Sequence, residues 1–314
     1  MMHVKLTRRH LLAVSATLLP VWSQAADRPP ARLVIVGGAE DRLQDKLILR
    51  RFLALSGGVD GNVLILTAAS LDQAASWAGY AQVFREIGAT QTSHLPIHSV
   101  EEANAPATVQ RILSADGIFL TGGDQRRLMQ RLAGTDAAHA LHIAFQVRSC
   151  CIGGTSAGAA AMAHVMLAEG DTPPLPEKDA AVLGLGLGFV ANAIIDQHFS
   201  QRRRLGRLLS ALAQRPDLLG VGIDEDTALL IERGKGVEVI GKGSVTLLDG
   251  RRMRTNYRDA ASSERLEMLG VRLHVLPAGN HYDSNASPRL NAKPVPASLR
   301  EAVAFLAVPG PIRE

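Results

Sequence analysis

The chain has 314 residues, of which 46% are hydrophobic and 20% charged, the composition of an ordinary globular protein. This excludes a disordered, collagen-like or disulfide-stapled chain and predicts one large domain, or one with an appendage. Aromatic residues make up only 4%, too few for a surface that stacks single-stranded nucleic acid. The formal charge of +4 includes three cations and no acid within residues 1–25. The remaining 31 basic and 30 acidic residues leave +1, which excludes nucleic-acid binding through a globally basic surface.

The N-terminal segment has the three parts of an export signal. A basic stretch ends at Arg8-Arg9, an apolar run extends from Leu11 to Trp22, and Ser23-Gln24-Ala25 puts small residues before a cleavage site. We therefore expect a signal peptide over residues 1–25 and export to the periplasm or the extracellular space, the alternative being an ordinary N-terminal helix. The apolar run is too short to span a bilayer of about 30 Å, so no membrane span is expected. The arginine pair resembles a twin-arginine signal.

The two cysteines of the chain, Cys150 and Cys151, are adjacent. Neighbouring Cα atoms lie about 3.8 Å apart, which is below the usual range for a disulfide. We expect two strand residues that face opposite sides of a sheet rather than a redox pair. No spaced set of cysteines and histidines indicates zinc, and neither a metal nor another cofactor is expected.

The first two thirds of the chain alternate short apolar runs with segments of helical periodicity. The predicted strands are, in order, Leu33–Val36, Val63–Leu66, Gly117–Leu120 and Ser149–Ile152. The intervening helices include one that begins at Leu43 and ends at Gly57-Gly58, and one from Trp77 to Ile87. This alternation predicts an α/β fold, a parallel sheet in a three-layer sandwich with helices on both faces. Ligands of such sheets bind at the carboxyl ends of the strands.

The character of the sequence changes after residue 219, where short strands follow one another closely. They are predicted at Val221–Ile223, Ala228–Ile231, Val237–Ile240, Val245–Leu248 and Val271–Leu276. We expect them to form an antiparallel C-terminal extension of the same sheet, within a single catalytic domain that covers residues 26–314. The proline-rich segment Asp171–Asp179 is predicted as a surface loop, and Ser298–Leu306 as a closing helix.

A G-x-S-x-G sequence, Gly154 to Gly158, follows the strand that ends at Ile152 and precedes a predicted helix, Ala159–His164. In this strand–turn–helix context the turn lifts the Ser156 hydroxyl off the end of the sheet, while the glycines avoid clashes. The helix N-terminus and the N–H of Ala157 favour the negative charge of an oxyanion. Ser156 is therefore the candidate nucleophile, and the alternative is a serine N-cap in a glycine-rich turn.

His198 is the candidate base, because it stands at the end of an apolar strand, where this architecture gathers site residues. The acidic turn Asp224-Glu225-Asp226 follows another strand end and can orient the imidazole, or it can be a plain solvated turn. The order nucleophile, histidine, acid differs from that of the α/β-hydrolases, which would require His274 or His281 as the base.

Six motifs occur in an order that resembles the cyanophycinases, a family of serine peptidases grouped with aspartyl dipeptidase. They are Gly37-Gly38-Ala39-Glu40, Gly122-Gly123-Asp124-Gln125, Gly154–Ala159, Gly184–Leu187, Ile195–Phe199 and Gly222–Ala228. The resemblance implies a class I glutamine-amidotransferase-like fold, a homodimer, and a triad of Ser156, His198 and Glu225. It also implies an exopeptidase that releases β-Asp-Arg dipeptides from cyanophycin, a polyaspartate whose β-carboxyls carry arginine.

An arginine cluster, Arg202–Arg204 and Arg207, opens the helix predicted after His198. The buried stripe of that helix is expected at Leu205, Leu208, Leu209 and Leu212, which leaves Arg202 and Arg204 beside it and Arg203 and Arg207 opposite. Cations in a first helical turn oppose the macrodipole, so we expect them to bind substrate carboxylates, the alternative being a solvated helix face. The resemblance assigns substrate binding to Gln125, Asp196, Gln197, Arg202, Arg204 and Arg207. Arg203 stands where the family usually has glycine.

The leading hypothesis is a secreted serine exopeptidase that acts on cyanophycin. Ser156 attacks the carbonyl, His198 transfers the proton and Glu225 holds the imidazole tautomer. The oxyanion donors are expected at Ala157 and at Gly123-Asp124. Two alternatives remain: an aspartyl or isoaspartyl dipeptidase with the same triad, and a periplasmic protein that binds such peptides without cleaving them.

Overall fold

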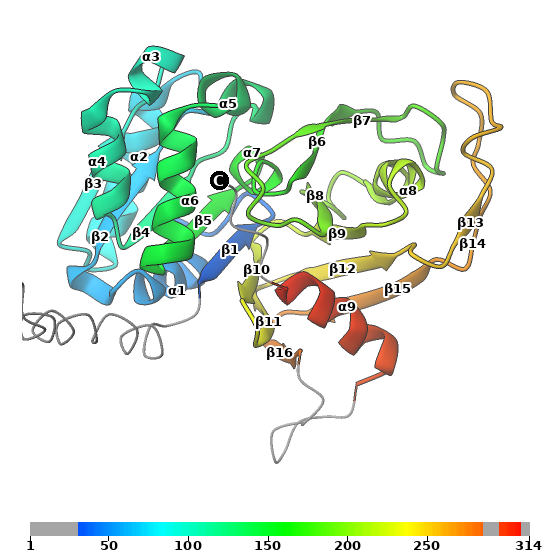
Figure 1. The fold of residues 1–314 in the computed structure, drawn as a ribbon. Coiled ribbons are helices and arrows are strands. Elements are labelled where there is room, and N and C mark those ends of the chain that lie inside the picture. The colour runs from blue at the N-terminus through cyan, green and yellow to red at the C-terminus, as the bar shows by residue number, and fades with distance from the viewer. Residues whose placement is uncertain (1–30, 285–294, 309–314) are drawn as a thin grey trace, which may run out of the picture. The chain divides into compact units, whose positions relative to one another are not determined.

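A mixed eight-stranded sheet, with the strand order β16-β11-β10-β1-β5-β4-β2-β3, forms the centre of the structure (Figure 1). The computed structural model describes residues 31–284 and 295–308, so the predicted signal peptide lies outside the described residues. Five adjacent strands of this sheet are parallel: β1 (Arg32–Val36), β5 (Cys151–Thr155), β4 (Gly117–Leu120), β2 (Asn62–Leu66) and β3 (Gln91–Leu95). The predicted α/β class is confirmed.

Helices cover both faces of the parallel strands, because alternate strand residues point to opposite sides. On one face, Val34 and Val36 pack with α1 (Leu47–Leu55) and α2 (Gln73–Glu86). On the other face, Leu33 and Ile35 belong to a core that also takes in residues of α4 (Pro106–Ser114), α5 (Gln125–Leu132) and α6 (Asp136–Arg148). The short elements η2 (Gly58–Asp60) and α3 (Val100–Ala103) complete this part.

The adjacent cysteines follow the same alternation. Cys150 packs in one core cluster and Cys151 in the other, and both are free thiols. Burial raises the pKa of the Cys151 thiol to about 12, so it stays protonated and unreactive at neutral pH. The expected opposite orientation and the absence of a disulfide are confirmed, although only Cys151 is a strand residue, because β5 begins there and Cys150 directly precedes it.

The first helix begins later than predicted. Its periodicity includes Leu43, but this side chain is 89% exposed and α1 starts at Leu47. The carboxylate of Asp41 accepts the N–H groups of Leu43 and Gln44, and Lys46 takes a left-handed φ of 53°. A local side-chain turn therefore replaces the expected first helical turn.

A second sheet has the strand order β15-β12-β9-β8. Its strands β8 (Ala193–Gln197) and β9 (Leu219–Ile223) are parallel, and β12 (Ser244–Asp249) and β15 (Arg272–Pro277) run antiparallel to their neighbours. The strands β10 (Thr227–Glu232), β11 (Gly236–Gly241) and β16 (Asn280–Asp283) instead extend the first sheet beside β1. The predicted antiparallel extension is thus divided between two sheets, since the chain passes to the first sheet at the acidic turn 224–226, back to the second between β11 and β12, and returns to the first for β16.

The remaining described elements pack beside the second sheet, except α9, which packs on β10, β11 and β16 of the first sheet. The strands β6 (Val165–Gly170) and β7 (Ala181–Leu185) form a hairpin around the predicted proline-rich loop, and β13 (Arg254–Thr255) pairs with β14 (Met268–Leu269). The helix α8 (Leu205–Gln214) packs on β8 and β9, and α9 (Ala297–Ala307) is the predicted closing helix. None of the helices within the described residues is long and apolar enough to cross a membrane.

Candidate active site

The segment around Ser156 is a sharp strand-to-helix turn. The strand β5 ends at Thr155, and Ser156 has φ 51° and ψ −113°, a conformation that a non-glycine residue rarely adopts. A side chain at Gly158 would meet the carbonyl oxygen of Leu120 at 2.3 Å, which explains the glycine at this close approach. The helix that follows, α7 (Ala157–Ala160), is only four residues long, shorter than the predicted Ala159–His164 and shifted towards the N-terminus.

The Ser156 side chain does not cap this helix. Its hydroxyl oxygen lies instead 2.9 Å from Nε2 of His198. On the other side of the imidazole, Nδ1 lies 2.6 Å from Oε1 of Glu225. The structure therefore brings the three predicted triad residues into one hydrogen-bonded chain. Ser156 thus occupies the N-cap position of α7 but does not cap it with its side chain, which disagrees with the interpretation of this serine as a helix cap.

The electrostatic surroundings of His198 suit a base. Burial lowers the pKa of its imidazole, the hydrogen bond to the carboxylate of Glu225 acts in the opposite direction, and the charge of Arg202 lowers the pKa further. The net direction is downward from 6.5, so the imidazole is neutral at pH 7 and can accept the proton of a serine hydroxyl. Of the two histidines that the alternative order could use, His281 pairs with Asp283 on β16 and His274 lies on β15.

One turn anchors all three triad segments through its backbone. Its successive carbonyl oxygens, those of Val36, Gly37 and Gly38, accept bonds from the N–H groups of Ser156 (3.1 Å), His198 (2.7 Å) and Asp226 (2.9 Å), respectively. Residues 36–38, which we call the anchoring turn, comprise the last residue of the central strand β1 and the two glycines that follow it. Because each bond fixes a residue that belongs to the triad or adjoins it, the relative positions of the triad depend on this turn.

Gly38 also leaves room for the imidazole. Its φ of 97° favours glycine, and a Cβ there would lie 2.3 Å from Cε1 of His198. The ring of His198 therefore rests directly against the backbone of the anchoring turn. This contact explains the second glycine of the Gly37-Gly38 pair, whose role the sequence alone does not specify.

The acidic turn has a separate function for each carboxylate. The carboxylate of Asp224 accepts hydrogen bonds from the backbone N–H groups of Ser200 and Ser244. The carboxylate of Asp226 accepts one from the backbone N–H of Asp41. Of the three carboxylates in this turn, Glu225 is the one that is hydrogen-bonded to the imidazole. The simple solvated turn is thus excluded. Sequence reasoning missed the side chain of Gln201, whose Oε1 accepts the N–H of Glu225 at 3.0 Å.

The predicted oxyanion donors divide into two groups. The N–H of Asp124 donates to the carbonyl of Ala69 at 3.0 Å, so its assignment as an oxyanion donor is corrected. Asp124 instead caps α5, since its carboxylate accepts the N–H of Arg126. A Cβ at Gly122 would lie 3.5 Å from that of Ser156, so the turn that also holds Gly123 runs beside the nucleophile. The N–H groups of Ala157 and Gly123 remain the predicted donors.

The arginine cluster differs from its predicted helical phase. The helix α8 begins only at Leu205, because residues 199–204 form turns and Arg203 has a φ of 52°. Leu205 is 42% exposed, and the buried side of the segment runs instead through Arg204, Arg207, Leu208, Ala211 and Leu212. Arg207 is therefore buried, contrary to the prediction, whereas Arg202 and Arg203 are exposed.

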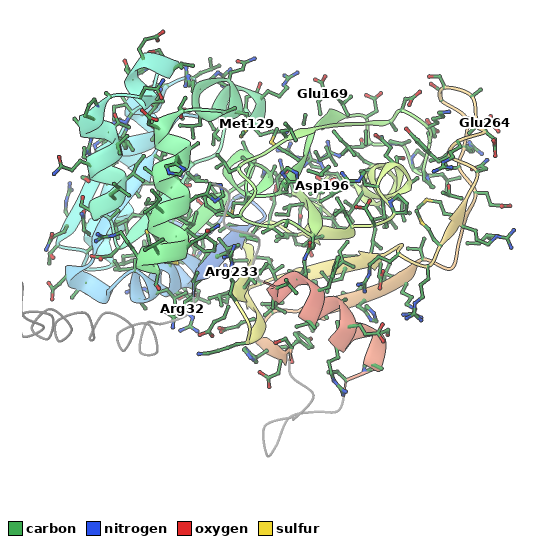
Figure 2. The ribbon with its side chains drawn as sticks, in the orientation of Figure 1. Arg32, Met129, Glu169, Asp196, Arg233 and Glu264 are labelled. Atoms are coloured by element: carbon green, nitrogen blue, oxygen red, sulfur yellow. The ribbon has the colours of Figure 1, made fainter. Side chains whose placement is uncertain are left out.

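The buried cluster is built around Asp196, at the carboxyl end of β8 (Figure 2). Arg207 donates two hydrogen bonds to the carboxylate of Asp196, from Nε to Oδ2 at 3.0 Å and from Nη2 to Oδ1. Nη1 of Arg204 donates a third, to Oδ1 at 3.2 Å. Nη1 of Arg204 also reaches the carbonyl of Gln197 at 2.5 Å. Asp196 is completely buried, so it does not offer the open substrate contact expected of it.

The buried cluster of Asp196, Arg204 and Arg207 carries one positive charge in excess. Burial raises the pKa of Asp196 above its usual value, although its bonds to Arg207 and the nearby charge of Arg204 limit the rise. Burial also lowers the pKa of Arg204 to about 10, which leaves the guanidinium charged at neutral pH. Within the described residues, Nε of Arg204 is a buried donor without a hydrogen-bond partner. Two guanidiniums and one carboxylate therefore have a net charge of +1, which one more anionic group would neutralise.

Two of the predicted binding residues are amides. Gln125 opens α5, and its Nε2 donates to the carbonyl oxygens of Leu167 (3.2 Å) and Ala168 (2.6 Å) on β6. Gln197 is buried beside His198 at the end of β8. In residues 31–284 and 295–308, no group of three or more histidine, cysteine, aspartate or glutamate side chains could hold a metal ion.

Comparison with known proteins gives matches over most of the chain. Residues 33–240 match the model of peptidase family S51. The chain is 37% identical to the cyanophycinase of Geminocystis herdmanii over 252 residues, 80% of this chain and 93% of that protein. It is also 37% identical to the cyanophycinase of a Nostoc species over 251 residues, 80% of this chain and 84% of that protein. A crystal structure of a peptidase from an acI-B1 actinobacterium shares the fold, with a TM-score of 0.57 and 20% identity over 81% of this chain and 97% of that one.

Proposed function

The chain belongs to peptidase family S51 and is a serine-type peptidase, and from this premise we propose that it hydrolyses cyanophycin and releases β-Asp-Arg dipeptides. Cyanophycin is the polymer that gives the curated relatives their name. It presents rows of carboxylate and guanidinium groups, so an enzyme that binds it must accommodate both signs of charge.

In the proposed mechanism, neutral His198 accepts the hydroxyl proton of Ser156 as Oγ attacks the backbone carbonyl. Glu225 holds Nδ1–H of the imidazole and stabilises the imidazolium that forms. The N–H groups of Ala157 and Gly123 stabilise the oxyanion. His198 then donates its proton to the leaving amine, the carbon–nitrogen bond breaks, and water repeats the sequence on the acyl-enzyme.

The buried arginine cluster is the observation that carries the substrate assignment. Arg204 and Arg207 exceed the charge of Asp196 by one, and Nε of Arg204 has no hydrogen-bond partner within the described residues. A carboxylate of the substrate supplies the missing charge and acceptor, since guanidinium–carboxylate pairs are strong and directional. Arg202, exposed and near enough to His198 to lower its pKa, can bind a second carboxylate. Gln125 and Gln197 are proposed to bind amide groups.

The comparison of polymer with small peptides tests this proposal. Wild-type protein should release β-Asp-Arg from insoluble cyanophycin, measured by mass spectrometry, with a higher kcat/KM per chain end than for free aspartyl or isoaspartyl dipeptides. Exclusive cleavage of the dipeptides would replace the polymer assignment with that of a dipeptidase. A protein that binds the polymer without any turnover would be a binding protein, which the strained Ser156 and its hydrogen-bonded triad disfavour.

We further propose that the protein is exported and acts as a homodimer. The three-part N-terminal segment supports export, and the mature protein isolated from the native host should begin at Ala26. If the export route is the twin-arginine pathway, replacement of Arg8-Arg9 by a lysine pair should stop export. Light scattering of the purified protein should give twice the mass of one mature chain, and the mass of a single chain would exclude the dimer.

A further inference from the structure

Glu40 is a buried carboxylate close to the nucleophile that the mechanism above does not use. It follows the anchoring turn by two residues, and its side chain is 1% exposed. Its two oxygens accept short hydrogen bonds, one from the hydroxyl of Tyr80 (2.5 Å) and one from Oγ1 of Thr155 (2.6 Å). Thr155 immediately precedes Ser156.

This burial requires a compensating arrangement. An ionised carboxylate away from water is unfavourable unless charges or hydrogen bonds stabilise it. The cation that the structure pairs with Glu40 is Arg42, at 3.8 Å, and its side chain is 45% exposed. The two hydroxyl donors therefore supply the short contacts. Burial and the charge of Glu40 raise the pKa of Tyr80, so its hydroxyl stays protonated and remains a donor.

The position of Thr155 connects this network to the nucleophile. Thr155 is the last residue of β5 and pairs with Val36, whose carbonyl accepts the N–H of Ser156. Its side chain is fixed by Glu40, on the same loop as the anchoring turn. Ser156 needs such support on its N-terminal side, because a strained φ of 51° persists only where the surroundings determine it.

We propose that Glu40 is a positioning residue, which acts through the hydroxyl of Thr155 to hold Ser156 in its strained, reactive conformation. The proposal rests on the proposed function of Ser156 as the nucleophile. Glu40 contacts neither substrate nor the reacting atoms. Loss of its bond to Thr155 therefore lowers kcat and leaves KM nearly unchanged.

A pair of substitutions separates positioning from stability. Thr155→Val and Tyr80→Phe each remove one hydroxyl donor from Glu40 and keep the shape of the side chain. Both should lower Tm by a similar amount, on the order of 5 °C, since each leaves one carboxylate oxygen without a donor. Only Thr155→Val should lower kcat, by about 10- to 100-fold, because only Thr155 adjoins the nucleophile. Thr155→Ser keeps the hydroxyl and should restore kcat to within about threefold of wild type.

The outcomes decide the proposal. Equal kcat losses in Thr155→Val and Tyr80→Phe would mean a merely structural network, and an undiminished kcat in folded Thr155→Val would remove the positioning role. If Thr155→Val does not fold, Glu40→Gln replaces it. This variant keeps the volume of the side chain but changes one oxygen into a donor, so its kcat must fall without a change in KM, and an unchanged kcat overturns the proposal.

A second readout is independent of the substrate. The rate of covalent labelling of Ser156 by a sulfonyl fluoride should fall in Thr155→Val and return in Thr155→Ser. If wild-type protein cleaves neither cyanophycin nor aspartyl dipeptides but is labelled at Ser156, the proposed substrate fails while the positioning role is still tested. If the labelling rate is the same in all three proteins, the positioning role fails by itself.

Discussion

The triad and the arginine cluster lie on neighbouring segments of the chain, but the protein fixes them in different ways. Backbone hydrogen bonds to the anchoring turn hold the triad, and two of its residues, Ser156 and His198, have left-handed φ values of 51° and 50°. The arginine cluster depends on side chains, since Arg204 and Arg207 are held by the carboxylate of Asp196.

This difference predicts different consequences of substitution. In the triad region a small displacement changes the geometry of the reacting atoms, so it should appear mainly in kcat. In the arginine cluster the loss of a charge changes the free energy of substrate binding and should appear mainly in KM. The following changes test that contrast, in order of decreasing effect.

Glu225→Gln should cause the largest loss, about 10³- to 10⁴-fold in kcat, because the amide no longer secures the tautomer that His198 needs. The matched control is Asp226→Asn in the same acidic turn, which keeps an oxygen for the N–H of Asp41. Its kcat should stay within about threefold of wild type. Steady-state kinetics at pH 8 measure both, and equal losses would show that the turn acts only through its overall charge.

Gly38→Ala should lower kcat about 10²-fold, because the added Cβ displaces the imidazole against which the anchoring turn packs. Gly58→Ala is its control. Gly58 also has a positive φ, 76°, but nothing lies within 4 Å of the position of its Cβ. Both variants should lose about 1 kcal/mol of stability from backbone strain, while only Gly38→Ala loses turnover. Normal kcat in folded Gly38→Ala would argue against the role of this contact.

Arg204→Ala should weaken transition-state binding by about 2 kcal/mol, or roughly 30-fold in kcat/KM, with most of the change in KM. It removes a guanidinium from a buried cluster and with it the unpaired Nε donor. Arg203→Ala, at the exposed position directly before Arg204, should change kcat/KM less than twofold. Equal effects of the two substitutions would contradict the binding role of the buried cluster.

The pH dependence supplies the smallest and most specific effect. His198 must be neutral to act as a base. The value of kcat/KM is therefore high at a pH above the pKa of His198 and decreases as the pH falls below that pKa. That pKa lies below 6.5, mainly because of burial, and Arg202 contributes in the same direction. Arg202→Ala should therefore move the acid limb of the kcat/KM profile to higher pH, whereas Arg203→Ala should not move it. A shift of the acid limb to lower pH in Arg202→Ala would contradict the conclusion that Arg202 lowers the pKa of His198.

The sequence predicted those parts of the site that depend on strand ends. Apolar runs marked β1, β5, β8 and β9, and polar residues directly after three of them form the triad. The parallel strands β8 and β9 present His198 and Glu225 at the same edge of the second sheet. The anchoring turn at the end of β1 joins the segments of both to Ser156 of the first sheet. Ser156, His198 and Glu225 could thus be selected without a structure.

The features that the sequence did not predict depend on contacts between distant segments. The helical phase of Arg207 was wrong because periodicity cannot reveal that Asp196 draws two guanidiniums inward. The hydrogen bond from the N–H of Asp124 to the carbonyl of Ala69 likewise depends on a contact between distant segments. The same holds for the division of the last strands between two sheets. Glu40 gave no chemical signal in sequence, since only the fold brings Thr155 to it.

The most direct test of the account is the digestion of cyanophycin by wild-type protein and by Ser156→Ala, with released β-Asp-Arg quantified by mass spectrometry. The wild type should release the dipeptide, and Ser156→Ala should fold with an unchanged circular dichroism spectrum and lose at least about 10⁴-fold in rate. Release of β-Asp-Arg at the wild-type rate by Ser156→Ala would contradict the assignment of Ser156 as the nucleophile.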